Sequence, residues 1–209
     1  MKIKLFVIIV VLLYAITNIN AGDKPKAVVQ EVSDSLVKII VDHKDDSDFA
    51  VRDGKISKIF LKSFDLVKMS GMTLGRTIWK EKLSAEQKQN FVNKYAEFIL
   101  TFYISKLSQY DNNKIVVKDA VMKSSGKKAT VPTTVEFNHA NAKVQYSLSN
   151  SSKGWRIYDV EVEGVRLTTT YRSQFQTIFN KKGYDNLIAE IDKLINRIKE
   201  KAEEEVKKE

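Results

Sequence analysis

The sequence contains no cysteine, and this absence excludes several classes of protein. A chain without thiols has no disulfide framework, no thiol nucleophile and no lipid anchor on an N-terminal cysteine. Histidine is nearly as scarce: His43 and His139 are the two copies, and both lie in polar segments where we expect surface positions. The chain has no H-x-x-x-H spacing, Walker-type phosphate loop or G-x-G-x-x-G motif. It therefore offers no recognisable metal or ATP site, and no cofactor is expected.

The charge balance is basic. The 209 residues include 35 lysines and arginines against 26 acidic residues, a formal net charge of +9. Such an excess favours contact with nucleic acid, an anionic lipid surface or an acidic protein. The lysines are scattered, without the arginine cluster or aromatic platform that single-stranded nucleic acid binding requires. An anionic membrane surface or an acidic partner therefore fits better, and no nucleic acid partner is expected.

Residues 1–21 have the pattern of a secretory signal peptide. Lys2 and Lys4 supply the positive start, residues 5–16 form an apolar run, and Ala21 is a small residue suited to cleavage. The run is short for spanning a bilayer, although an uncleaved membrane anchor is the alternative. We expect the chain to be exported and cleaved after residue 21.

Helical periodicity begins soon after this segment. Pro25 suits a first helical turn, and apolar residues recur at three- and four-residue steps up to Ile40. The acidic run 45–48 lacks the turn glycine and distal glutamate of a calcium loop, so we expect a solvated loop. The pattern resumes over residues 56–69, where Asp65 is placed to cap a second short helix.

A long helix is predicted from Ser84, which forms a capping box with Gln87, to about residue 107. Its apolar stripe is wide and rich in aromatic residues, as expected for a helix that packs against a sheet. Two further helices are predicted over residues 169–181 and 184–199, with a break at Lys182–Gly183. The charge run 200–209 reads as a solvated helix end.

Between these helices the apolar period changes to two. Alternation predicts strands over residues 115–121, 131–137, 144–148 and 155–162, the last followed by a corner at Gly164 and a short strand. The resulting fold class is α+β: a four-stranded curved antiparallel sheet packed against N-terminal and C-terminal helices. One domain is expected over residues 22–199.

Two positions in the predicted sheet are irregular. Pro132 has no N–H group, so its strand should lie at an edge or begin there. A bulge is expected at Tyr158–Asp159, because Val160 and Val162 continue the apolar set of Trp155 and Ile157 out of phase.

The carboxylate of Asp159 has two possible roles, one catalytic and one structural. In an apolar strand, burial could raise its pKa and make it a general base for an enzyme acting on a small apolar substrate. Alternatively, it accepts hydrogen bonds from backbone donors at the bulge or from an arginine such as Arg172. We favour the second reading.

Two blocks of this sequence carry a family resemblance. One is W-x-I-Y-D-V-x-V-E-G-V-x-L followed by Y-R-S-Q-F, starting at Trp155; the other is L-G-R-x-x-W with E-Q-x-x-F, starting at Leu74. Both resemble the MlaC family of toluene-tolerance proteins, auxiliary components of an ABC transport system, over about residues 28–195. The pattern departs at Lys80, where a family arginine often follows the tryptophan.

The resemblance implies a non-enzymatic periplasmic carrier. Such a protein holds a phospholipid by its acyl chains in an apolar cavity between sheet and helices, and so helps maintain outer-membrane lipid asymmetry. The implied partners are an outer-membrane lipoprotein–porin complex and an inner-membrane ABC transporter with a substrate-binding ring subunit. A structural or adhesive secreted protein with a solid core is a further alternative to the carrier and the enzyme.

The expected cavity lining combines inward strand residues with residues of the facing helices. The set is Met69, Leu74, Phe98, Phe102, Val135, Phe137, Val144, Tyr146, Leu148, Trp155, Ile157, Val162, Tyr171, Phe175 and Phe179. At the mouth, Arg166 and Arg172 are predicted to meet a phosphate as planar donors. The alternative for both arginines is an ion pair with Asp159, Glu161 or Glu163.

Overall fold

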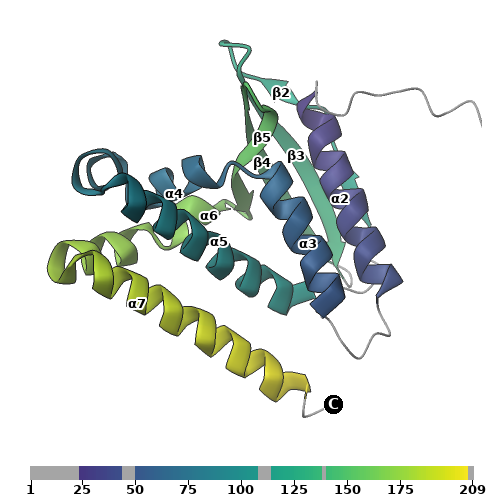
Figure 1. The fold of residues 1–209 in the computed structure, drawn as a ribbon. Coiled ribbons are helices and arrows are strands. Elements are labelled where there is room, and N and C mark those ends of the chain that lie inside the picture. Colours follow the sequence, from purple (N-terminus) through teal and green to yellow (C-terminus); the bar gives the residue numbers. More distant parts are fainter. Residues whose placement is uncertain (1–23, 44–49, 108–113, 138–139, 207–209) are drawn as a thin grey trace, which may run out of the picture.

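The computed structural model describes residues 24–43, 50–107, 114–137 and 140–206. The proposed signal peptide, the acidic run 45–48 and His139 lie outside the described residues. The architecture is α+β, with helices against an open, curved antiparallel sheet, as Figure 1 shows.

The N-terminal helices follow the predicted pattern. They are α2 (Pro25–Asp42), α3 (Ala50–Ser63) and α4 (Leu66–Leu74), followed by a π-helical turn, η1 (Ile78–Lys82). Asp65 caps α4 as expected, its Oδ1 accepting a hydrogen bond from the Lys68 N–H at 3.1 Å. α2 packs on α3 and on strands of the sheet, and these two helices lie together against it (Figure 1).

Helix α5 (Ala85–Leu107) begins at the predicted capping box. The Gln87 N–H donates to Ser84 Oγ at 3.1 Å, and the Ser84 N–H donates to Gln87 Oε1 at 3.0 Å, so both exposed donors are satisfied. α5 packs mainly on the C-terminal helix α7 (Arg172–Val206), and the two run side by side (Figure 1).

The sheet has six strands, so the predicted number of four is wrong. They are β1 (Ile115–Val117), β2 (Val121–Met122), β3 (Lys128–Phe137), β4 (Ala140–Ser151), β5 (Gly154–Val162) and β6 (Val165–Arg166). Neighbours follow the order β1-β3-β4-β5-β6, and β2 also pairs with β3. The segment predicted as one strand over residues 115–121 is divided into β1 and β2, and the strand after Gly164 joins the same sheet as β6.

The division of this first strand explains why the expectation for Pro132 is also wrong. Pro132 lies inside β3, paired with Gln145 of β4, and not at an edge or at the start of a strand. Its carbonyl accepts the Lys118 N–H at 2.9 Å, just where the pairing passes from β1 to β2. The missing proline donor thus faces an interruption of the neighbouring strand, where no acceptor needs it.

The predicted bulge is confirmed. Ser147 pairs with Asp159 but Leu148 pairs with Ile157, so Tyr158 is an extra residue on β5. This shift brings Val160 and Val162 onto the face that carries Ile157, opposite Tyr146 and Val144. We call this face of the sheet the inner face and the opposite one the outer face.

Positive φ angles mark two of the predicted chain reversals. Glu163 and Gly164, with φ of 49° and 81°, form the two-residue turn between β5 and β6. Gly183, with φ 81°, interrupts α7 at the predicted helix break. The helix α6 (Leu167–Thr170) precedes α7, which continues to Val206.

Candidate functional site

An aromatic core joins α5 to the start of α7. We define it as Phe91, Tyr95, Phe98 and Phe175, each at most 1% exposed. Phe91 stacks on Tyr95 with ring centroids 5.8 Å apart, and Phe175 meets Phe91 edge-on at 6.3 Å. Such aromatic contacts fill space between helices without leaving room for a ligand.

A second aromatic group lies beside this core but is not fully buried. We define the tyrosine cluster as Tyr103 of α5, Tyr146 of β4 and Tyr171 between α6 and α7. Tyr171 also contacts the aromatic core, since its ring meets Phe98 edge-on at 4.7 Å. Tyr103 is 39% exposed, and Tyr146 and Tyr171 are partly buried.

Electrostatic effects link Tyr103 to both of the other tyrosines of the cluster. Burial raises the pKa of Tyr146 to about 12, and the nearby Tyr103 adds to this shift. Burial also raises the pKa of Tyr103, with further contributions from Tyr171 and Asp159. Burial alone raises the pKa of Tyr171. The cluster therefore connects the end of α5, the inner face of the sheet and the start of α7.

These side chains are surrounded by protein and still partly accessible. Such a combination is typical of residues around a recess. No hydrogen bond joins the hydroxyls of Tyr103, Tyr146 and Tyr171 to any residue of the described ranges. A hydroxyl in an apolar recess favours a partner from solvent or from a ligand.

The surroundings of the cluster are apolar. Phe102 contacts Tyr103 edge-on at 5.3 Å, and Val160 pairs with Tyr146 across the sheet. Val162 follows on the same inner face and is 37% exposed. α5 has its main contacts with α7, α4 and α3, and within the described residues it makes no extensive contact with a strand. Tyr103 and Phe102 near the end of α5 and Tyr146, Val160 and Val162 on the inner face are therefore all apolar or aromatic side chains with accessible surface.

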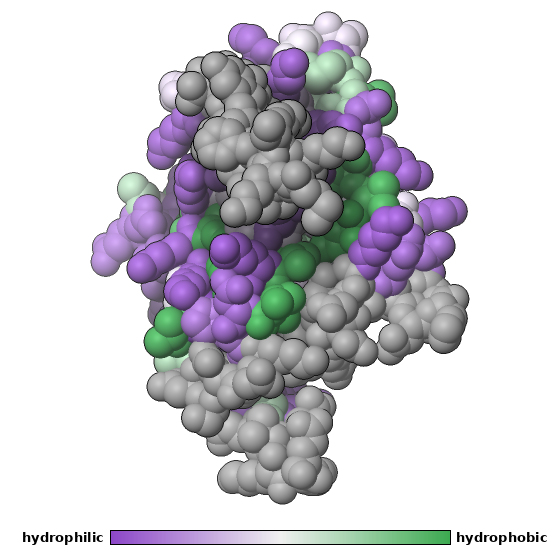
Figure 2. All heavy atoms as spheres, turned by 90° about the vertical axis from the view of Figure 1, so that its right-hand side faces the viewer, coloured by the Kyte–Doolittle hydropathy of each residue, from purple (hydrophilic) through white to green (hydrophobic). Residues whose placement is uncertain are grey.

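Hydrophobic side chains are unevenly distributed over the surface. Figure 2 shows a group of them at mid-height on one face, with hydrophilic residues on both sides. An exposed apolar area framed by polar residues is typical of a binding surface.

Asp159 lies next to the tyrosine cluster and is 2% exposed. Its Oδ1 accepts the N–H groups of Val160 at 3.1 Å and Thr168 at 3.2 Å. These bonds match the backbone-acceptor reading of this residue. Burial nevertheless raises the pKa of the carboxyl against the lowering effect of these donors, and its Oδ2 has no partner in the described part of the chain.

The two predicted mouth arginines are both exposed. Arg166 donates through Nε to Glu161 Oε2 at 2.9 Å, which is the ion pair foreseen as the alternative to a phosphate contact. The guanidinium of Arg172 lies against Gly75, where a Cβ would come within 3.0 Å of its Nη2. Neither arginine bonds to Asp159.

The structure divides the predicted lining residues into two groups. Those packed in the buried core are Met69, Leu74, Phe98, Val144, Leu148, Trp155, Ile157 and Phe175. Those with accessible surface are Phe102, Val135, Tyr146, Val162, Tyr171 and Phe179. The side chain of Phe137 lies outside the described ones. Tyr103 and Val160 belong with the accessible group and were absent from the predicted set.

The signals for these two omissions were present in the sequence. Tyr103 lies beside the aromatic stripe of its helix, and Val160 follows the predicted bulge on the inner face.

The described residues hold no group of three or more histidine, aspartate or glutamate side chains that could bind a metal ion. Within the same residues, no helix is both long and apolar enough to cross a bilayer.

Comparison with known proteins agrees with this architecture. The family model described as MlaC protein matches residues 30–193, more than half of the chain. The chain belongs to the MlaC family. The resemblance carried by the two sequence blocks is thereby confirmed.

The chain is also similar to two curated proteins. The toluene tolerance protein ttg2D of Pseudomonas putida is 32% identical over 108 residues, covering 51% of this chain and 50% of the relative. The intermembrane phospholipid transport system binding protein MlaC of Haemophilus influenzae is 29% identical over 114 residues, covering 52% of each chain. The chain spans about half the length of these curated relatives.

A solved structure shares the fold of this MlaC-family chain. It is a phospholipid-binding protein from Ralstonia solanacearum in complex with a phospholipid, with a TM-score of 0.75 and 20% sequence identity. The match covers 84% of this chain and 99% of the solved one. The arrangement of helices over a curved sheet is therefore common to both proteins.

Proposed function

We propose that this chain is a phospholipid carrier that holds the acyl chains of its ligand against the tyrosine cluster and the inner face of the sheet. The observation that carries the proposal is the accessible apolar surface of Phe102, Tyr103, Tyr146, Val160 and Val162 beside a fully packed aromatic core. Membership of the MlaC family and the fold shared with a phospholipid-binding protein support it.

The physical requirement of such a carrier is a dry surface for hydrocarbon. Each CH₂ group left in water costs about 0.8 kcal/mol, so a tail of roughly fifteen carbons costs on the order of 12 kcal/mol to expose. A concave protein surface lined by apolar, partly accessible side chains can shield a hydrocarbon tail from water, whereas a tightly filled core has no room for it. The hydroxyls of the tyrosine cluster can supply donors to ester or phosphate oxygens near the entrance.

The proposed carriage makes and breaks no covalent bond. The protein would collect a phospholipid from one membrane complex and release it to another in the periplasm, which would maintain outer-membrane lipid asymmetry. An outer-membrane lipoprotein–porin complex and an inner-membrane ABC transporter with its ring subunit are the proposed partners. The apolar segment 5–16 supports export of the chain.

Release requires the apolar surfaces to separate. α5 and α7 pack on each other more extensively than on the strands, so these two helices can move as one body relative to the sheet. We expect docking on a partner complex to drive this movement and loosen the grip on the acyl chains.

The enzyme alternative rests on the raised pKa of Asp159, which is a property of many catalytic bases. Its carboxylate is 2% exposed and bonded to two backbone N–H groups. A substrate therefore has little access to this group. The carrier hypothesis predicts that Asp159→Asn retains lipid transfer, and loss of a turnover reaction in this variant would favour the enzyme.

Transfer of a fluorescent phospholipid between donor and acceptor vesicles tests the carrier directly. The wild-type chain should accelerate transfer, and Phe102→Glu should abolish both transfer and co-purifying lipid, because a carboxylate in the lining opposes acyl chains. Val41→Glu is the matched control, since Val41 is 50% exposed on α2 and the added charge meets water. Equal loading of Phe102→Glu and wild type would refute this lining. Leu148 is a poorer choice, because it is fully buried and a charge there would unfold the sheet.

A further inference from the structure

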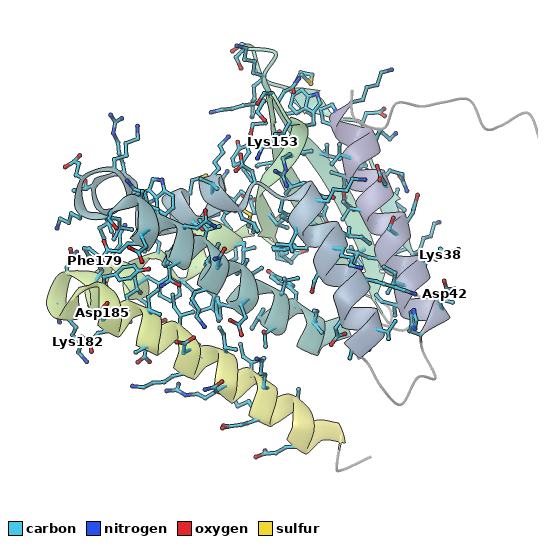
Figure 3. All side chains as sticks on the ribbon, viewed as in Figure 1. Lys38, Asp42, Lys153, Phe179, Lys182 and Asp185 are labelled. Carbon is cyan, nitrogen blue, oxygen red and sulfur yellow. The ribbon has the colours of Figure 1, made fainter. Side chains whose placement is uncertain are left out.

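One end of the sheet carries a concentration of lysines. Lys123 and Lys127 lie in the β2–β3 turn, Lys128 is the first residue of β3, and Lys153 lies in the β4–β5 turn; all four are exposed. Over residues 120–158 the single acidic residue is Glu136, which lies near the other end of β3. We call this part of the molecule the hairpin end. The β2–β3 hairpin projects beyond the helices in Figure 1, and Lys153 lies at the same end in Figure 3.

Basic residues also line up across the outer face at this end. Lys128 of β3 pairs with Ser149 of β4, and Ser149 pairs with Arg156 of β5, so the three lie in one row. Lys68 of α4 reaches the same row and donates to Ser149 Oγ at 2.9 Å. Its ammonium also lies 3.6 Å from the centre of the Tyr158 ring.

The charges of this row are not balanced by acids. Burial lowers the pKa of Lys68, repulsion from Lys128 lowers it further, and Asp65 offsets only part of this. Asp65 is already engaged in capping α4. Some lysines in other parts of the molecule do contact carboxylates: Lys26 contacts Asp119 at 2.8 Å, and Lys94 contacts Asp192 at 2.8 Å. Among the described residues, Lys123, Lys127, Lys128 and Lys153 have no such partner.

Apolar side chains accompany these lysines. Val121 is 56% exposed and Met122 is 48% exposed, and both lie on β2 immediately before the turn. An anionic membrane surface presents charged headgroups above an apolar acyl-chain region. A projecting hairpin that carries both lysines and exposed aliphatic side chains can interact with both regions. The lysines would meet phosphate groups, while Val121 and Met122 would enter the boundary between headgroups and acyl chains.

We propose that the hairpin end is a docking surface for an anionic phospholipid bilayer. The surface comprises Lys68, Lys123, Lys127, Lys128 and Lys153 with Val121 and Met122. It involves other residues than the proposed acyl-chain lining, and it goes beyond carriage by defining how the protein meets a membrane. A chain that carries no lipid would still bind vesicles through this surface.

Co-sedimentation with vesicles tests the proposal. The full chain should bind vesicles that contain phosphatidylglycerol and not vesicles of phosphatidylcholine alone, and salt should weaken this binding. Each lysine near an anionic surface contributes about fivefold to binding. Combined substitution of Lys123, Lys127 and Lys128 by Gln should therefore reduce binding on the order of a hundredfold.

A control of equal charge uses Lys80, Lys181 and Lys182, which are exposed outside the hairpin end. Lys182 lies near the bend of α7, far from Lys153 in Figure 3. Changing these three lysines to Gln should leave vesicle binding within about threefold of wild type, because the surface that touches the bilayer is unchanged.

Met122→Ser adds a test of the apolar part without altering charge. It should weaken binding several-fold and leave the salt dependence unchanged. The proposal is overturned if wild type ignores phosphatidylglycerol vesicles, or if the hairpin and control variants lose binding equally. Binding to an acidic protein without binding to these vesicles would also overturn it and assign the lysines to a protein partner.

Discussion

The aromatic core and the tyrosine cluster are neighbouring groups of aromatic residues that both include part of α5, yet they differ in packing. In the core, Phe91 and Phe175 have no accessible surface. In the cluster, Tyr103 and Tyr146 remain accessible although burial raises the pKa of both. Under the proposed function, the aromatic core supplies stability and the neighbouring tyrosine cluster supplies the surface that meets the ligand.

The largest expected effect is on the core. Phe91→Ala should lower the free energy of unfolding by about 3–5 kcal/mol, because it leaves a cavity among rings that cannot collapse onto it. Chemical denaturation measures this loss. Lipid content per folded molecule should remain that of wild type. A variant that is stable but empty of lipid would show that the core also holds the ligand.

The matching change in the lining is Phe102→Ala. Because Phe102 is only partly buried, its loss should cost about 1–2 kcal/mol of stability, less than the core substitution. Removal of its contact with the acyl chain should accelerate phospholipid release by roughly tenfold. Stopped-flow release of a fluorescent phospholipid measures this rate. If release is unchanged while stability falls as far as in Phe91→Ala, Phe102 belongs to the core.

Removal of single hydroxyl groups sharpens the distinction further. Tyr95→Phe should cost about 1 kcal/mol, because the Tyr95 hydroxyl lies 3.0 Å from Thr73 Oγ1 in the buried interior. Tyr146→Phe should change the stability of the lipid-free protein by less than about 0.5 kcal/mol, because its hydroxyl has no partner in the described residues. Thermal unfolding of the two variants side by side tests this order, and equal losses would contradict it.

The smallest of these expected effects is the contribution of Asp159 to the pH dependence of stability. Burial raises the folded-state pKa of Asp159, so the folded state binds its proton more tightly than the unfolded state. Stability should then fall as pH rises from about 3.9, the ordinary aspartate value, through the raised folded pKa, and level off above it. Asp159→Asn should remove this part of the slope. Denaturation midpoints measured across this pH range would contradict the account if both proteins changed in parallel.

Most of the fold could be predicted from local patterns. The capping box at Ser84, the cap at Asp65 and the bulge at Tyr158 depend on neighbouring residues, and all three are confirmed. The number of strands depends on long-range pairing: β1 and β2 separate opposite Pro132, and β6 joins the sheet through two residue pairs. Alternation within a short segment cannot reveal such interruptions.

The site was harder to predict for a related reason. Periodicity shows that a side chain points inward, but it does not show whether another side chain fills the space opposite. Leu148 and Tyr146 lie two residues apart on the same inner face, yet Leu148 is fully buried and Tyr146 is accessible. The difference depends on which elements pack opposite each side chain, and that is a property of the whole fold.

Native mass spectrometry of the chain isolated gently from its host tests the central claim most directly. The account predicts a folded protein with a mass excess of one or a few phospholipid molecules, which organic extraction removes and identifies. A folded chain that has no excess mass, and gains none after incubation with phospholipid vesicles, would contradict it.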